Sequence, residues 1–399
     1  MNKIALGVTS SISIYKAADI IRLFQKEDLA VQVIMTERAT NFIQPEFFTA
    51  LSGQPAIVSL FDQKQRPIEH ITLASEISLL VIAPATANII AKLASGLADD
   101  FLSTFYLAVK APVLIAPAMN EAMFLHPQTQ ANIKKLKDLG VVWVEPESGY
   151  LACGQKGSGR LASPEKIVQL GLRLIRQQPV FKDKLIVVTA GPTREALDPV
   201  RFLSNRSSGK MGYELAREAY ERGAEVVLIS GPVELSPPAG VKVERVFSSE
   251  DMRQAVLKYY DQASAVIMSA AVSDFRFSQA GREKIKKEDI PSAVRLEKTP
   301  DILEELGRLK RGQLLVGFAA ETSEAKARAR EKMEKKKVDL MVVNDVSRQD
   351  IGFESDDNEV WLLWPDGRER LIPKTTKRKV SQEILTEIGA MFNGRKGNN

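Results

Sequence analysis

Short apolar segments alternate with amphipathic segments along almost the whole chain, and this alternation starts twice. The first run opens with the apolar segment 3–8 and the second with the segment 184–189. In each run a loop of glycine and hydroxyl residues follows, and then residues with helical spacing. This order of strand, loop and helix is typical of a parallel sheet that is covered by helices on both faces. The sequence therefore predicts an α/β fold with two doubly wound domains.

The break between the two runs lies near Pro179, because a proline cannot continue the helix predicted over 164–178. A chain of 399 residues also exceeds one typical hydrophobic core. We therefore expect one domain over residues 1–178 and another over residues 183–399. The further strands expected are 31–35, 78–83, 112–116, 141–144, 224–230, 241–246, 264–269, 314–317, 338–343 and 358–364. The further helices expected are 13–26, 41–51, 86–95, 99–110, 209–223, 249–261, 299–310, 321–337 and 375–392.

Composition excludes several classes of function. The 55 basic and 50 acidic residues give a formal net charge of only +5, and no basic stripe is interleaved with aromatic residues, so no nucleic-acid partner is expected. No apolar run approaches the roughly 20 residues of a membrane helix, so no membrane association is expected. Cys153 is the only cysteine, which excludes a cysteine-rich zinc site and fits a reducing, cytoplasmic setting.

The loops that open the two runs lie where α/β proteins bind phosphate. The loop 7–11 contains Ser10 and Ser11, and the loop 189–193 contains Gly191. Both are expected at the carboxyl end of a strand and against the amino terminus of a helix. Neither matches the glycine pattern of dinucleotide-binding proteins, and the chain has no Walker A sequence. The residues alone predict two phosphate-binding domains, neither of the standard dinucleotide type.

Three more polar segments follow strand ends in the first half and are expected at the same crevice. They are 36–40, 84–88 and 116–123. The last two both contain Pro-Ala followed by an asparagine. Thr40, Thr86 and Asn120 also suit helix N-caps, an alternative that needs no ligand. Capping does not explain why two such segments are directed at one crevice.

The lone thiol of Cys153 lies in a glycine-rich segment, with Lys156 and Arg160 close to it in sequence. Glycine packs nothing and loses the most backbone entropy when it is ordered, so we expect a mobile, polar flap. The two cations favour the thiolate. The alternative is an incidental surface cysteine.

Together, the loop 10–16, His70, the segments 84–88 and 117–123 and the Cys153 flap resemble the flavin-dependent cysteine decarboxylases. The resemblance covers residues 1–175 and implies a flavodoxin-like fold that binds FMN and decarboxylates 4'-phosphopantothenoylcysteine. It implies His70 as a base, Asn120 as the group that holds the substrate carboxylate, and Cys153 as the acid of a late step. Thr86, Ile89 and Phe124 depart from residues common in that family. The FMN-binding residues implied are Ser10, Ser11, Thr36, Pro84, Ala85, Thr86, Asn88 and Met119.

Polar segments also follow the predicted strands of the second half. The loop 207–209 precedes a helix and can cradle an anion, although Ser208 as an N-cap is the simpler alternative. Three arginines and Asn205 lie in the segment 194–206. The cationic segment 284–287 is by itself typical of a solvated loop. The other segments of this kind are 270–275, 298–301 and 317–322.

These segments closely resemble the phosphopantothenate–cysteine ligases over residues 184–390, with a Rossmann-like nucleotide-binding sheet. The resemblance implies that CTP and Mg²⁺ activate 4'-phosphopantothenate as an acyl-cytidylate, from which cysteine displaces CMP. It implies that Lys284 faces the phosphates and that Asn205 stabilises the acyl-cytidylate. It does not assign the Mg²⁺ ligands. The CTP-binding residues implied are Met268, Ser269, Ala270, Asp274, Lys284, Pro300, Asp301, Ile302, Leu303, Phe318, Lys332 and Lys336.

The two resemblances together imply a bifunctional enzyme of coenzyme A biosynthesis, in which the ligase half makes the substrate of the decarboxylase half. They also imply a homo-oligomer with trimeric decarboxylase contacts and dimeric ligase contacts. Three alternatives stay open at this point. They are a flavin prenyltransferase-like protein with an unrelated nucleotide domain, a non-catalytic flavoprotein, and an NAD(P)-dependent reductase, which the missing glycine pattern argues against.

Overall fold

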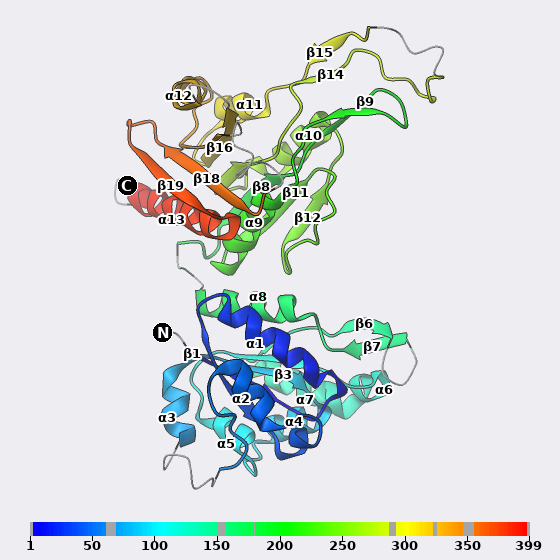
Figure 1. The fold of residues 1–399 in the computed structure, drawn as a ribbon, viewed down its shortest axis with the longest axis vertical. Helices are drawn as coiled ribbons and strands as arrows, with labels where there is room; N and C mark the ends of the chain where they lie inside the picture. The colour runs from blue at the N-terminus through cyan, green and yellow to red at the C-terminus, as the bar shows by residue number, and fades with distance from the viewer. Residues whose placement is uncertain are drawn as a thin grey trace. The chain divides into compact units, whose positions relative to one another are not determined.

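The computed structural model describes residues 3–60, 69–150, 156–176, 178, 180–286, 293–321, 325–345 and 355–396. The chain divides into two compact units, Met1–Arg176 and Gln177–Asn399 (Figure 1). Cys153 lies outside the described residues, and so does Lys287.

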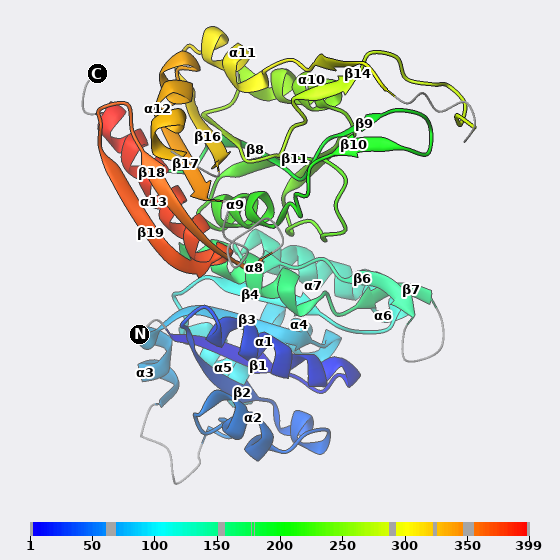
Figure 2. The same ribbon diagram turned by 45° about the horizontal axis from the view of Figure 1, so that its top comes forward.

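The first unit is built on a five-stranded parallel sheet (Figure 1 and Figure 2). The strand order changes direction between the first and third strands of the chain, as it does in flavodoxin-like folds. The strands are nearly continuous apolar runs because helices cover both faces of the sheet. In spatial order the strands are β2 Ala30–Met35, β1 Lys3–Val8, β3 Ile77–Ala85, β4 Val113–Pro117 and β5 Val142–Trp143.

Side chains of β1 alternate between two hydrophobic clusters, one on each face of this sheet. Ile4 and Leu6 pack with the helices α1 and α8, whereas Ala5 belongs to the cluster with α4, α5 and α7. The helical elements are η1 Ile12–Lys16, α1 Ala17–Gln25, η2 Glu37–Asn41, α2 Pro45–Ser52, α3 Glu69–Glu76, α4 Ala87–Ser95, α5 Phe101–Ala108, α6 Glu121–Leu125, α7 Pro127–Asp138 and α8 Pro164–Arg176.

The described residues of the glycine-rich segment belong to an antiparallel hairpin. Its strands are β6 Glu147–Tyr150 and β7 Lys156–Arg160, which lie beside α6 (Figure 1). Three of the glycines therefore lie in strands and not in an irregular loop. Glycine is tolerated there because this two-stranded hairpin has no hydrophobic core that side chains must fill.

The second unit contains an eight-stranded mixed sheet. Six parallel strands have the order 3-2-1-4-5-6 in chain terms, which is the Rossmann order, and two antiparallel strands extend one edge. The point where the order reverses lies between β8 and β13. In spatial order the strands are β12 Lys242–Arg245, β11 Glu225–Ser230, β8 Leu185–Ala190, β13 Ala265–Met268, β16 Leu314–Glu321, β17 Leu340–Asp345, β18 Asp357–Leu363 and β19 Glu369–Thr376.

Helices also cover both faces of the second sheet. Ile186 and Val188 of β8 pack with α9 Lys210–Glu221 and α13 Lys377–Lys396. Val187 points to the other face and packs with α10 Ser249–Tyr260, α11 Ile302–Leu309 and α12 Ala325–Lys335. Two small hairpins project from this unit: β9 Arg194–Ala196 with β10 Phe202–Ser204, and β14 Phe275–Phe277 with β15 Leu296–Lys298.

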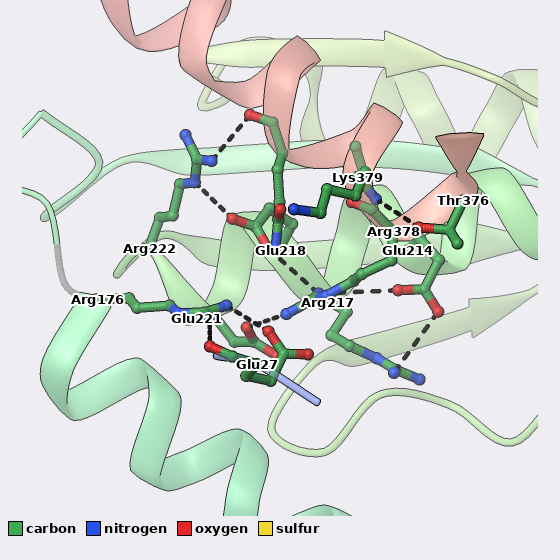
Figure 3. Close-up of polar contacts among 12 residues, drawn as sticks. Glu27, Arg176, Glu214, Arg217, Glu218, Glu221, Arg222, Thr376, Arg378 and Lys379 are labelled. Carbon is green, nitrogen blue, oxygen red and sulfur yellow. Dashed lines mark hydrogen bonds and ion pairs between the residues drawn. The ribbon is translucent and has the colours of Figure 1, made fainter. Parts of the chain in front are cut away.

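A network of buried charges joins α9 to α13 (Figure 3). Glu218 accepts a hydrogen bond of 2.7 Å from Nε of Arg222 and lies 3.2 Å from the guanidinium of Arg378. Arg378 also donates to Glu221, and Arg222 donates to the Gln382 carbonyl oxygen over 2.8 Å. The carboxylates of Glu218 and Glu221 are almost fully buried, so each needs these partners.

The predicted fold class is confirmed, and the differences are local. The helix predicted over 13–26 begins as the 3₁₀ turn η1, in which the Ser11 side chain accepts the Ser13 N–H. The helix predicted over 41–51 begins only at Pro45, a residue that suits the first turn. The sequence patterns do not indicate α7 or β19, whose apolar residues are sparse. No helix of the described part is long and apolar enough to span a bilayer.

Candidate functional site

A cavity of about 700 Å³, the flavin-half cavity, opens at the carboxyl ends of β1, β3 and β4. This is the edge at which open α/β sheets bind ligands. Its wall combines hydroxyl groups, one ammonium group and several apolar side chains. The lining residues are Ser10, Ser11, Ile12, Ser13, Tyr15, Lys16, Thr86, Ala87, Ala118, Met119, Asn120, Met123, Gly159 and Arg160.

Hydrogen bonds between neighbouring strand ends hold the loops around this cavity. Thr9 Oγ1 donates to the Pro84 carbonyl oxygen over 2.7 Å and accepts from the Thr86 N–H over 3.1 Å. Thr86 and Asn120 cap α4 and α6 by accepting backbone N–H groups. The capping interpretation is therefore correct for both residues, although both also line the cavity. It is wrong for Thr40, which lies inside η2 and donates to the Glu37 carbonyl oxygen.

The hairpin β6–β7 is docked onto the segment that follows β4. The Met119 N–H donates to the Gly159 carbonyl oxygen over 2.9 Å. Glu121 Oε1 accepts from the Ser158 N–H over 2.8 Å and from the Ser158 hydroxyl over 3.0 Å, and these bonds lower the pKa of the Glu121 carboxyl. The base of the flap is thus fixed to the rim of the cavity.

Lys16 supplies the positive charge of this cavity. Burial lowers the pKa of the Lys16 ammonium, and the nearby charge of Arg160 lowers it further. Its Nζ donates to the Leu161 carbonyl oxygen over 3.3 Å. Two cations held close together in this way favour an anionic ligand.

The donor set of the cavity fits FMN. Ser10, Ser11 and Lys16 suit a phosphate group, and Ile12, Tyr15 and Met123 are exposed apolar side chains that suit the faces of a ring system. The volume of about 700 Å³ lies within the usual range of cofactor pockets.

The residues predicted for the first half are only partly brought together. Ser10, Ser11, Thr86, Met119 and Asn120 line the cavity. The other predicted residues are not among its lining residues. Pro84 and Ala85 are buried at the end of β3, Asn88 is exposed on α4, Thr36 has a buried hydroxyl with no partner among the described residues, and His70 lies on α3 with its ring 6.4 Å from the Phe101 ring.

A second cavity of about 750 Å³, the ligase-half cavity, lies at the carboxyl end of β13 and the start of α9, and residues of β16 and β17 also line it. It sits at the switch point of the Rossmann order. The lining residues are Asn205, Ser207, Ser208, Gly209, Lys210, Met211, Gly212, Met268, Ser269, Ala270, Ala271, Val272, Ser273, Asp274, Phe275, Lys298, Thr299, Pro300, Asp301, Ile302, Leu303, Phe318, Ala319, Lys332, Lys336, Met341, Asn344, Asn358 and Lys377.

Glycines let α9 start close to the sheet. A Cβ built on Gly212 would lie 2.7 Å from Ser269 Oγ and 2.9 Å from the Thr189 carbonyl oxygen. Gly209, with a φ of 78°, occupies the N-cap of α9, so the alternative interpretation of Ser208 as the cap is wrong. Glycine suits this position because it adopts a positive φ without steric cost.

Side-chain hydrogen bonds fix the loop that follows β13. Asn205 Nδ2 donates to the carbonyl oxygens of Ala271 and Val272 over 3.1 and 3.2 Å. The Ser273 N–H donates to Thr193 Oγ1 over 2.9 Å. Asn205 therefore positions this loop from the segment that precedes the α9 turn.

The opposite wall is formed by the start of α11 and the end of α12. Asp301 caps α11 by accepting the Glu304 N–H over 3.0 Å, and its carboxylate lies 2.7 Å from Nζ of Lys336. Burial raises the pKa of Asp301, but the hydrogen bonds from Lys336 and from the Glu304 N–H, together with the charges of Lys336 and Lys335, outweigh burial, so the pKa is lowered overall. Phe318 and Leu303 add an apolar surface suited to a base.

Lys284 is the one predicted CTP-binding residue that is absent from this lining. It is exposed, and its neighbour Ile285 is attached to the segment 198–201. The Ile285 N–H donates to Asp198 over 3.3 Å, and Arg201 donates to the Ile285 carbonyl oxygen over 3.2 Å. Sequence reasoning assigned no role to Lys210, Asn344, Asn358 and Lys377, which also line the cavity. Lys210 lies in a segment that carries the resemblance, whereas the other three lie outside those segments.

No group of three or more His, Cys, Asp or Glu side chains suited to a metal ion occurs in the described ranges.

Comparison with known proteins accounts for both halves. The family "Flavoprotein" matches residues 1–176, and the family "DNA/pantothenate metabolism flavoprotein C-terminal domain" matches residues 181–391. The coenzyme A biosynthesis bifunctional protein CoaBC of Bacillus subtilis is 46% identical over 392 residues, which cover 97% of each chain. CoaBC of Escherichia coli K12 is 41% identical over 391 residues, covering 97% of this chain and 96% of that one.

A solved structure, the C-terminal domain of a CoaBC protein, is 40% identical with a TM-score of 0.48, and the match covers 54% of this chain and all of that one. The full-length relatives decide against a flavin half joined to an unrelated nucleotide domain. The chain belongs to the family of bifunctional coenzyme A biosynthesis proteins.

Proposed function

We propose that the unit Gln177–Asn399 joins 4'-phosphopantothenate to cysteine with consumption of CTP, and that the unit Met1–Arg176 decarboxylates the product with bound FMN. The observation that carries the proposal is the match to bifunctional relatives over almost the whole chain, with a separate cavity in each half. The ligase product is the decarboxylase substrate, which gives one chain a reason to hold both.

In the flavin half, Ser10, Ser11 and Lys16 would hold the FMN phosphate, and the apolar rim would contact the ring system. When bound, FMN supplies the oxidation of the substrate thiol that makes loss of CO₂ possible. Asn120 would hold the substrate carboxylate by hydrogen bonds without a charge. His70 would act as a base and Cys153, outside the described residues, as an acid.

His70 does not line the flavin-half cavity of its own chain, so its role requires another copy of the chain or another ligand pose. Several large apolar residues of this unit are exposed, and self-association would bury those that lie in the contact. They support the proposed homo-oligomer, with trimeric contacts of flavin halves and dimeric contacts of ligase halves. The exposed residues are Ile12, Tyr15, Phe42, Phe47, Met123 and Leu125.

In the ligase half, the α9 turn and the lysines would bind the CTP phosphates with Mg²⁺, and Phe318 and the segment 300–303 would contact the base. The carboxylate of 4'-phosphopantothenate attacks the α-phosphorus, and pyrophosphate leaves. The cysteine amine then attacks the acyl carbon, and CMP leaves. Lys284 would stabilise the charge on the α-phosphate, and Asn205 would support the second step.

The test is to incubate the purified protein with 4'-phosphopantothenate, cysteine, CTP and Mg²⁺ and to measure pyrophosphate and CO₂. We expect both products in equal amounts, and no CO₂ when CTP is left out. Absence of pyrophosphate contradicts the ligase proposal. Pyrophosphate without CO₂, even from protein loaded with FMN, contradicts the decarboxylase proposal alone.

A further inference from the structure

Lys377 is a buried lysine at one end of the ligase-half cavity. It is the first residue of α13, and only 6% of its surface is exposed. Its Nζ donates to the Ser355 carbonyl oxygen, and its N–H donates to the Asp356 carbonyl oxygen over 2.9 Å. Lysine is seldom buried to this degree, so its presence at a cavity wall calls for a reason.

A second lysine, Lys210, reaches the same end of the cavity from the first residue of α9. Its Nζ lies 2.6 Å from the carboxylate of Asp356, whose side chain is 85% exposed. Burial lowers the pKa of Lys377 to about 8, and the charge of Lys210 contributes to this shift against the opposing effects of Asp356 and Asp357. The protein thus holds two cations close together, although burial and mutual repulsion disfavour the charge of Lys377.

The neighbouring residue keeps Lys377 in this unfavourable position. Arg378 pairs with the buried carboxylates of Glu218 and Glu221, so the start of α13 is held against α9 (Figure 3). Lys377 therefore cannot turn to solvent without disturbing a buried ion network.

The wall near these lysines is small and polar. Ser207, Ser208 and Gly209 line the same cavity at the start of α9 and leave room for a group that needs hydrogen-bond donors. An anionic phosphate group accepts hydrogen bonds from hydroxyl and ammonium groups, so the serines and the two lysines at this end of the cavity suit such a group.

We propose that Lys377, together with Lys210, binds a phosphate group of the ligand that occupies the ligase-half cavity. The inference rests on the proposed ligase function, which brings two phosphate-bearing ligands to this half, CTP and 4'-phosphopantothenate. Binding of the phosphate restores the full charge of Lys377, because an adjacent anion favours the protonated amine.

The test compares Lys377→Met and Lys210→Met with Lys379→Met. Lys379 is exposed and lies two residues further along α13, so it controls for the loss of one positive charge. Calorimetric titration gives the Kd of each protein for Mg-CTP and CMP, and for 4'-phosphopantothenate and pantothenate. Loss of a charge-assisted hydrogen bond is expected to weaken binding of the phosphate-bearing ligand by about tenfold or more.

The ratio within each ligand pair identifies the source of the phosphate. If Lys377→Met and Lys210→Met weaken Mg-CTP about tenfold more than CMP, the lysines hold the triphosphate. If instead they weaken 4'-phosphopantothenate more than pantothenate, they hold the phosphate of the acyl substrate. The ratio of the two Kd values of one variant also remains valid when that variant is partly unfolded. Lys377→Arg is expected to keep part of the affinity because it keeps the charge.

A pH series separates a binding role from a structural one. We expect the wild-type Kd for the phosphate-bearing ligand to increase as the pH is raised beyond 8, because the unliganded Lys377 then loses its proton. This increase should be absent in Lys377→Met. The charged groups that face Lys377 are Lys210 on α9, Asp356, and Asp357 at the start of β18. If both ratios and the pH profile of Lys377→Met equal those of Lys379→Met, the inference is wrong while the ligase proposal stands. If wild-type protein binds no CTP, the ligase proposal fails instead.

Discussion

The docking of the β6–β7 hairpin onto the rim of the flavin-half cavity gives a sharp prediction for Gly159→Ala. Gly159 has a φ of 123°, and a Cβ built on it would lie 2.4 Å from the Met119 carbonyl oxygen, whereas real Cβ contacts are essentially never under 3.0 Å. The same two residues share the hydrogen bond of 2.9 Å from the Met119 N–H to the Gly159 carbonyl oxygen. Relief of the clash therefore requires the hairpin to move away and this bond to break.

The cost combines backbone strain at the positive φ with the loss of one hydrogen bond at a partly buried site. These effects are worth on the order of 1–3 and about 1 kcal/mol respectively. Together they give about 3 kcal/mol, which shifts the equilibrium between the docked and undocked hairpin roughly a hundredfold. We expect the rate of CO₂ release to fall by a comparable factor while the rate of pyrophosphate release from the ligase half stays unchanged.

The matched control is Gly140→Ala in the same unit. Gly140 also has a positive φ, 87°, but a Cβ there would meet no atom within 4 Å, so this variant measures backbone strain without the clash. Amide hydrogen exchange of residues 156–160 reports docking directly. The reasoning is refuted if Gly159→Ala decarboxylates like Gly140→Ala and its hairpin amides exchange at the wild-type rate.

Four further results are expected. The Lys284→Ala variant should lose ligation activity and keep its bound flavin. An unchanged ligation rate would mean that Lys284 belongs only to a solvated loop. Cys153→Ser should release CO₂ but accumulate the ene-thiol form of the product, detected by mass spectrometry; normal turnover would make the thiol incidental. Glu218→Gln should destabilise the second unit by about 3 kcal/mol, because it removes the buried negative charge that pairs with both Arg222 and Arg378. That cost lowers its melting temperature by roughly 6–12 °C, whereas the exposed Glu383→Gln should change it little; equal shifts would contradict the account. Finally, Lys377 has a folded pKa of about 8, below that of an unfolded lysine. Between the folded and the unfolded pKa, the unfolded chain therefore binds more protons than the folded chain. The free energy of unfolding of the wild type, measured by urea titration, should accordingly increase relative to that of Lys377→Met as the pH rises from 8 to 10. A constant difference would contradict this prediction.

The sequence predicts much of the fold because its strands are buried on both faces. Runs such as 78–83 are apolar without interruption and differ clearly from the amphipathic helices around them. The hairpin of the flap and β19 escape prediction, since Gly157 and Gly159 suggest an irregular loop, and the residues 369–376 carry few apolar side chains. β7 pairs with β6 and β19 pairs with β18, so a neighbouring strand fixes each of them without an apolar pattern of its own.

The candidate sites show the same division. Polar residues directly after strands, such as Ser10 and Ser269, do line the cavities, because parallel strands bring their carboxyl ends together. Lys377 carries no such signal. Lys377 is buried because the segment 355–357 packs against the start of α13. In the sequence alone, a single lysine at the start of a helix cannot be distinguished from a solvated charge.

Each of the four hydrophobic clusters found among the described residues is confined to one of the two units. Each half therefore has hydrophobic cores of its own among the described residues. Gene fusion or fission at the segment near residue 178 would leave both cores intact, and a half whose activity became dispensable could be lost or replaced without unfolding the remaining one. Calorimetry should accordingly record two melting transitions, the first-unit transition raised by flavin and the second-unit transition by CTP.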